Sequence, residues 1–233
     1  MIKIIKSLDR QFNDFGWLKT FWLFSFSNYY DPANLQHGKL RVFNDDTVQP
    51  GKGFSTHPHE EMEIITLVLD GEITHKDSMG NQGVIRAGEV QRMSAGTGLT
   101  HSEYNTSKTG LAFYQIWILP DKRGLEPSYA QRQFKPEAFK NTVFPVASGQ
   151  TMPDTVSFHT DATIYRSILD SGKTVEFLTA KDRYLFVYVS SGSIRINNHL
   201  LSQKDQARIS LESVLTFSAV QTTDFILVDV PEA

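Results

Sequence analysis

Thr56-His57-Pro58-His59-Glu60-Glu61-Met62-Glu63 and, further along, Thr100-His101-Ser102-Glu103 are the most informative stretches of this chain. Three of its seven histidines fall in these two clusters, and the key residues of each are two positions apart. Alternate side chains of an extended strand point to one face, so each cluster can present a pair of ligands. If the two strands face each other across a barrel, four side chains could surround one metal ion: His57, His59, His101 and Glu103. Imidazoles with a carboxylate suit a first-row transition metal better than calcium or magnesium.

Composition narrows the class of protein. The 233 residues allow one large domain or two smaller ones, and 40% hydrophobic content supports a real core. A net charge of -3 gives no electrostatic reason to expect direct nucleic-acid binding. No apolar run approaches a membrane span, and residues 1–6 lack the apolar stretch of a signal peptide. Without cysteine, disulfides and thiolate metal sites are excluded. We therefore expect a soluble cytoplasmic protein that binds neither nucleic acid directly nor membrane.

The chain alternates between short apolar runs and tight turns, which predicts an all-β sandwich or barrel. The clearest strands cover residues 64–69, 72–75, 84–86, 89–93 and 111–119. Asp70-Gly71 and Ala87-Gly88 separate neighbouring runs, and such turns predict two hairpins. Residues 136–140, with Pro136 near the first turn, predict a short helix.

The second half of the chain shows a weak repeat of the first. Residues 68–73 resemble residues 189–194, and each half ends in a strand followed by proline. In this alignment His101 and Glu103 correspond to Phe217 and Ala219, while His57 and His59 correspond roughly to Leu178 and Ala180. The second copy thus has apolar groups where the first has candidate ligands. If the repeat is real, the strands fold without histidines there, so the first-half cluster is functional.

The two clusters resemble the motifs of the cupin superfamily. That pattern is a glycine, five residues, His-x-His, three or four residues, a glutamate and a later glycine, then Gly-x-x-His-x-x-x-Asn. The first motif is matched by Gly51, His57, His59, Glu63 and Gly71, with Gly71 one residue late. The second is matched by Gly98, His101 and Asn105, while Gly96 replaces a common proline.

Within the cupins, the chain resembles the pirin family. The matching segments, which cover most of residues 15–120, are 24–32, 40–46, 53–59, 77–81 and 93–98. The resemblance implies an all-β bicupin of two antiparallel β-barrels. Residues 1–130 would form the metal-binding N-terminal cupin and residues 131–233 a C-terminal cupin that lacks metal ligands.

The pirin resemblance implies that His57, His59, His101 and Glu103 bind one divalent transition metal ion: iron, nickel, copper, manganese or zinc. A generic cupin would instead use Glu63 as the carboxylate ligand, so both glutamates stay candidates for ligand and for catalytic base. Three neutral histidines and a carboxylate leave an octahedral ion two open positions, whereas a tetrahedral ion keeps none. Without a metal, burying this cluster would cost several kcal/mol, roughly.

The resemblance also implies quercetin 2,3-dioxygenase activity, in which dioxygen opens a flavonol ring with loss of carbon monoxide. A substrate hydroxyl would bind at an open metal position, and Glu103 or Glu63 would take its proton. Phe43 or Tyr114 could stack on the flat substrate, or could equally be core residues. The alternatives are a metal-dependent regulatory pirin that binds a protein partner without turnover, and a different cupin reaction.

The remaining histidines and glutamates fit ordinary roles. His37, His159 and His199 are expected to be surface or core residues, and Glu60 and Glu61 to be solvated. His75 follows the Asp70-Gly71 turn on a predicted strand, so it could line the pocket.

Overall fold

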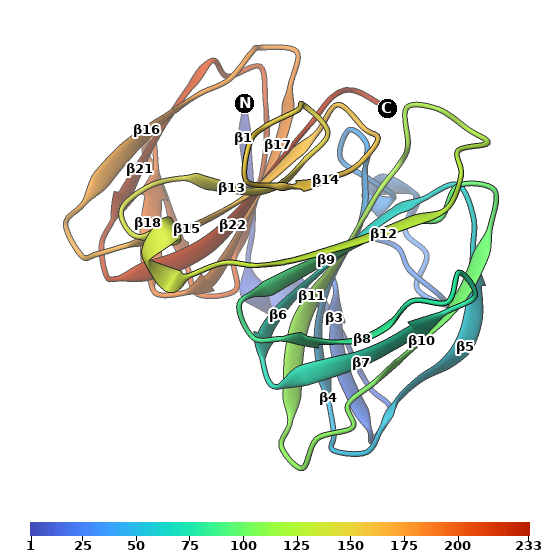
Figure 1. Cartoon of the computed structure of the whole chain (residues 1–233). Coiled ribbons are helices and arrows are strands. Elements are labelled where there is room, and N and C mark those ends of the chain that lie inside the picture. Colours follow the sequence, from blue (N-terminus) through green and yellow to red (C-terminus); the bar gives the residue numbers. More distant parts are fainter.

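The computed structural model describes residues 1–233 as an all-β protein of four sheets, which confirms the predicted fold class (Figure 1). Each half combines one seven-stranded and one four-stranded sheet, and the four sheets are separate rather than joined into two closed barrels. The only helices are single 3-10 turns, so none is long enough to cross a membrane. They are η1 (Ser7–Asp9), η2 (Pro32–Asn34) and η3 (Pro136–Phe139), the last lying where a short helix is predicted.

The first half contains the sheets that carry both sequence clusters. Its large sheet consists of β2 (Gln11–Asp14), β3 (Leu18–Trp22), β4 (Leu40–Val48), β6 (Glu63–Asp70), β9 (Glu89–Ser94), β11 (Leu111–Ile118) and β12 (Ser128–Gln133). Its small sheet consists of β5 (Gly53–His59), β7 (Glu72–Asp77), β8 (Gln82–Arg86) and β10 (Leu99–Tyr104).

The second half repeats this arrangement. Its large sheet consists of β1 (Ile2–Ile5), β13 (Phe144–Ser148), β14 (Val156–Ser157), β15 (Thr163–Leu169), β17 (Tyr184–Ser191), β20 (Gln206–Ser210) and β22 (Thr223–Val230). Its small sheet consists of β16 (Thr174–Leu178), β18 (Ser193–Ile196), β19 (His199–Ser202) and β21 (Val214–Ala219).

The two hairpins predicted at Asp70-Gly71 and Ala87-Gly88 are wrong. In both places the chain steps from one sheet to the other, and the hairpin is formed by β7 with β8, Glu72 opposite Arg86. A hydrogen bond joins the two corners, since the amide of Ala87 donates to the carbonyl oxygen of Gly71. A Cβ at Gly71 would lie 2.5 Å from the carbonyl oxygen of Gly110, so a close backbone approach fixes this corner.

Strand pairing supports the match of residues 68–73 with residues 189–194 but corrects the predicted equivalents of the ligands. The amide of Gly51 donates to the carbonyl of Asn105 as that of Gly172 donates to Ala219, and Tyr104 pairs with Thr74 as Ser218 pairs with Arg195. The equivalents of His101 and Glu103 are therefore Leu215 and Phe217, two positions before the aligned residues, and both are buried apolar side chains.

The other two equivalences need correction as well. Phe177 pairs with Leu215 as His57 pairs with His101, so Phe177 takes the place of His57. Leu178, the residue aligned with His57, is 74% exposed, and Ala180 lies beyond the end of β16. Moving the alignment of a strand by an odd number of residues places each side chain on the opposite face. The lengths of the loops do not determine whether such a shift is odd or even.

Three apolar layers hold the molecule together. The largest cluster, of 23 buried residues, lies between the two large sheets and joins the halves. A second, of 15 residues, fills the space between the two sheets of the second half. The matching space in the first half has two smaller apolar clusters, of seven and four residues, and buried polar side chains that include His101 and Glu103. This difference places the site in the first half.

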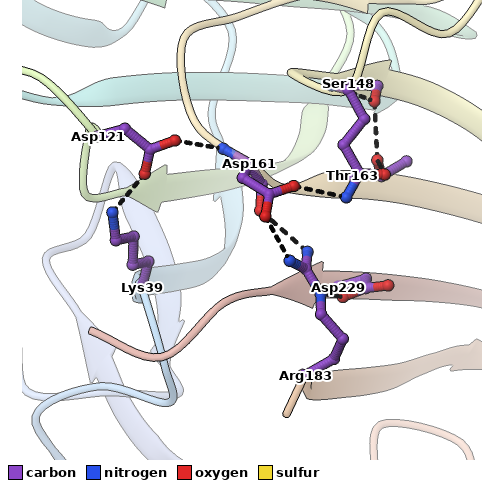
Figure 2. A network of polar contacts seen from close by, with 8 residues as sticks. Lys39, Asp121, Ser148, Asp161, Thr163, Arg183 and Asp229 are labelled. Atoms are coloured by element: carbon purple, nitrogen blue, oxygen red, sulfur yellow. Dashed lines mark hydrogen bonds and ion pairs between the residues drawn. The ribbon is translucent and has the colours of Figure 1, made fainter. Parts of the chain in front are cut away.

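Polar contacts also cross between the halves. Figure 2 shows Asp121 between Lys39 and Asp161, and Arg183 directed at Asp161 and Asp229. The amide of Asp161 donates to Asp121 (2.7 Å), and Arg183 pairs with Asp161 (2.8 Å) and Asp229 (2.6 Å). Strands also cross the predicted boundary at residue 130. β1, at the start of the chain, belongs to the large sheet of the second half, and β12, in the large sheet of the first half, extends from Ser128 to Gln133. The division into 1–130 and 131–233 stays a prediction.

Candidate metal centre

Three imidazoles converge on the inner face of the small sheet of the first half. β5 and β10 are hydrogen-bonded neighbours in that sheet, so they do not face each other across the interior as the sequence suggested. His57 pairs directly with His101, and His59 with Leu99, which brings the ring centroids within 4.5–4.8 Å of one another. The Nε2 atoms of His57 and His101 are 3.0 Å apart. Two adjacent ligands of an ion with bonds of about 2.1 Å lie at about that separation.

The electrostatic state of these imidazoles suits metal ligation. Nδ1 of His57 lies 2.8 Å from the carbonyl oxygen of Ser55, so Nδ1–H donates there and the Nε2 lone pair stays free. Burial, together with neighbouring imidazoles, lowers the pKa of His59 to about 4 and that of His101 to about 2. Both are therefore neutral near pH 7, the form that binds a metal.

Glu103 supplies a buried carboxyl group beside this cluster. Nε2 of Gln115 donates to its Oε2 (3.0 Å), and no lysine or arginine forms an ion pair with it. Burial raises the pKa of Glu103 to about 7. A carboxylate oxygen of Glu103 and ring nitrogens of His75 and His101 all lie within 4.8 Å of one another. Ring nitrogens of His57, His59 and His101 form a second group of this kind. His101 thus links the carboxylate to the other two imidazoles, and a divalent cation would offset the uncompensated carboxylate.

His75 is a supporting residue next to the cluster of three imidazoles. Its Nε2 lies 3.1 Å from Oδ2 of Asp77, and Nε2 of Gln91 lies 3.3 Å from its Nδ1. Asp77 is in turn fixed by the side chain of Asn81 (2.9 Å). Both ring nitrogens of His75 are therefore engaged, with Nε2–H donating to Asp77, and the ring does not line the cavity described below. It orients its neighbours rather than offering a free lone pair.

The structure does not bring Glu63 into either histidine group. The Ser94 hydroxyl donates to its Oε2 (2.6 Å) and the amide of His159 donates to its Oε1 (3.2 Å). Burial raises the pKa of Glu63, against the hydrogen bond from Ser94. With both oxygens engaged and one of them tied to the second half, Glu63 occupies a junction between the halves.

The other histidines and glutamates have separate roles. Nε2 of His37 contacts the carbonyl oxygens of Leu185 and Ile209, and His199 is exposed. Glu60 is exposed, while Glu61 accepts from the amide of Gly124 (2.9 Å).

A cavity of about 450 Å³ opens onto His57, His59 and Glu103. Six aromatic side chains line it, including all three tryptophans of the chain: Trp17, Trp22, Trp117, Phe15, Phe26 and Phe54. Polar side chains from the large sheet complete it: Thr20, Asn44, Asp46 and Gln115. Volume and lining are those of a site for a flat aromatic molecule with a few polar groups.

Phe43 and Tyr114, suggested as stacking residues, are not in this cavity. They alternate with Asn44 and Gln115, so they point to the opposite face of the large sheet, into the core between the halves. The tryptophans and the polar residues of the large sheet were missed in the sequence. The available signal was the pair Asn44 and Asp46, which puts polar groups at alternate positions of an otherwise buried strand.

Comparison with known proteins agrees with this geometry. Residues 5–118 match the family model "Pirin", and residues 145–230 match "Quercetinase C-terminal cupin domain". The chain is 40% identical over 232 residues to "Quercetin 2,3-dioxygenase" of Escherichia coli strain K12, covering 99% of each. It is 41% identical to "Pirin-like protein" of Caulobacter vibrioides, covering 93% of this chain and 94% of that one. The structure of bacterial pirin YhhW from E. coli in complex with nickel(II) superposes with a TM-score of 0.95 at 38% identity, covering 100% of both chains.

Proposed function

Because the chain belongs to the pirin family, we propose that it is a metal-dependent dioxygenase of the quercetin 2,3-dioxygenase type, which opens a flavonol ring with dioxygen. The observation that carries the proposal is the meeting of three imidazoles and a buried carboxyl group at one end of an aromatic cavity. The name of the E. coli relative supplies the substrate class.

His57, His59, His101 and Glu103 would hold one divalent ion of iron, nickel, copper, manganese or zinc. When bound, the ion supplies a Lewis-acidic position that lowers the pKa of a substrate hydroxyl and gathers substrate and dioxygen at one place. With three neutral imidazoles and one carboxylate as ligands, a divalent ion would keep one net positive charge, which favours binding of the deprotonated flavonol.

Glu103 is the residue placed to accept the hydroxyl proton. Its Oε2 accepts the hydrogen bond from Gln115, which leaves Oε1 for the proton. Burial raises the pKa of this carboxyl group in the metal-free protein, so the surroundings favour its protonated form, as a proton acceptor requires. Glu63 lacks a free oxygen and does not line the cavity, so the role is assigned to Glu103 alone.

The aromatic walls bind and orient the substrate. Phe54 packs edge-on against Trp17, with ring centroids 5.1 Å apart, and Trp117 packs edge-on against His59 at 5.0 Å. These rings offer flat apolar surface to a flavonol and exclude water from the reacting end.

The direct test is loss of the flavonol absorbance band in air, using purified protein whose metal content has been measured. We expect turnover with at least one of iron, nickel, copper or manganese, and none after chelation. A protein that binds these ions at the histidines but turns over no flavonol with any of them would contradict the dioxygenase proposal. It would favour a metal-dependent binding protein.

A pH dependence of metal binding follows from Glu103. Since its pKa is raised from 4.5 to about 7, the group is mostly protonated at pH 6 and must lose that proton to ligate a metal. We therefore expect Glu103 to contribute roughly one released proton at pH 6 and almost none at pH 8.5. Calorimetric nickel titrations in two buffers of different ionisation enthalpy measure this release for the native protein and for Glu103→Gln. Equal proton release by the two proteins at pH 6 would exclude Glu103 as a ligand.

A further inference from the structure

The wall of the cavity that the large sheet forms carries two buried oxygens without a hydrogen-bond partner. Asn44 and Asp46 lie on β4, and Thr20 faces Asp46 across the β3–β4 pair. Asn44 and Asp46 are each 3% exposed, and both line the cavity together with His57, His59 and Glu103. Oδ1 of Asn44 and Oδ1 of Asp46 are buried with no hydrogen-bond partner.

This arrangement differs from that of the neighbouring carboxylate. Asp45 points to the opposite face of β4, where Lys204 (2.8 Å) and the hydroxyl of Tyr188 (2.7 Å) satisfy it. Asp46 forms no ion pair and belongs to no metal-ligating group. The Thr20 hydroxyl faces this carboxyl group, but Oδ1 of Asp46 has no partner, and a buried oxygen left so is costly unless a ligand completes it.

The second half of the chain shows that the fold does not require a carboxyl group here. Asp46 lies opposite Phe113 on β11, and the equivalent residue of the repeat, opposite Phe225 on β22, is Ser167. By the same pairing Gln115 corresponds to Leu227, which lies in an apolar core. The buried carboxyl group and Gln115 are thus properties of the half that contains the cavity, although Ser167 is also a buried polar side chain.

We propose that Asn44 and Asp46 form a second anchoring point that accepts hydrogen bonds from substrate hydroxyl groups other than the one held at the metal. The inference rests on the proposed function for the position of the substrate, and it adds a preference within that substrate class. The preferred ligand is a polyhydroxylated flavonol rather than one with the 3-hydroxyl alone. A site built from buried acceptors discriminates against an analogue without the matching hydroxyl, because the acceptors then stay unpaired.

Binding under nitrogen separates this inference from turnover. All three tryptophans line the cavity, so quenching of their fluorescence reports its occupancy in the nickel-loaded protein. We expect quercetin to bind at least about tenfold more tightly than 3-hydroxyflavone. In Asp46→Ala this preference should fall at least about fivefold, while Thr47→Ala, at an exposed position of the same strand, keeps it.

The unfolding temperature of Asp46→Ala provides the structural check. If Asp46 serves the ligand, its removal should not lower the midpoint, whereas a structural role would lower it. Equal affinities for the two flavonols in the native protein, or an unchanged preference in Asp46→Ala, would overturn the inference. Selective binding of quercetin without oxygen-dependent loss under any metal would support the anchoring point and contradict the dioxygenase proposal instead.

Discussion

A His101→Ala variant is expected to lose both its bound metal ion and its turnover. His101 belongs to both groups of candidate ligands, and its ring centroid lies 4.5 Å from that of His57 and 4.8 Å from that of His59. It projects from β10, which pairs with β5 on one side and β7 on the other, so it lies between the strands that carry the other candidate histidines. Loss of a supporting residue alone typically weakens metal affinity 10–100-fold, so loss of this ligand should cost at least about 100-fold.

Nickel titration and metal analysis after dialysis measure this loss, and the same preparation is assayed for flavonol cleavage. His199→Ala is the matched control, because His199 is an exposed histidine on β19 of the second half. The control should keep one ion per chain. A His101→Ala protein that keeps the ion at native affinity would contradict the site.

A Phe43→Ala variant is expected to lose about 3–5 kcal/mol of unfolding free energy. Phe43 is fully buried between the two large sheets, and its ring centroid lies 5.1 Å from those of Tyr114, Phe186 and Tyr188. Truncation would leave a cavity where the halves meet. Urea unfolding measures the change.

Leu178→Ala is the control for that experiment, since Leu178 is 74% exposed and its truncation should cost less than about 0.5 kcal/mol. The folded Phe43→Ala protein should keep native affinity for nickel and for quercetin. Unchanged stability with weakened quercetin binding would instead place Phe43 at the substrate.

The sequence predicted the all-β class and the apolar character of the second-half positions that match His101 and Glu103, because alternation along strands and motif spacing are local properties. The pairing of strands is not local. Asp70-Gly71 has hairpin chemistry, but it forms a corner between sheets because the backbone of Gly110 packs against it. The same limit applies to the equivalents of His57 and His59, where a shift along β16 changed the face.

The contents of the cavity could be predicted only in part. The histidines carry their own signal, since three of seven lie in two short clusters. Gln115 carries none, and the alternation of Asn44 with Asp46 indicates a polar face but not that Asp46 points inward, because a polar residue in a strand usually faces solvent. They face inward because a second sheet covers the inner face and the other half of the molecule covers the outer face.

Nickel affinity of Glu103→Gln compared with Glu63→Gln tests the proposed metal centre most directly. Both glutamates are buried, but only Glu103 lines the cavity and groups with His101. Titration at pH 7.5, with circular dichroism to verify folding, should show binding of one ion by the native protein and by Glu63→Gln with similar affinity. Glu103→Gln should bind at least about tenfold more weakly. Native affinity in Glu103→Gln together with lost binding in Glu63→Gln would contradict the centre formed by His57, His59, His101 and Glu103.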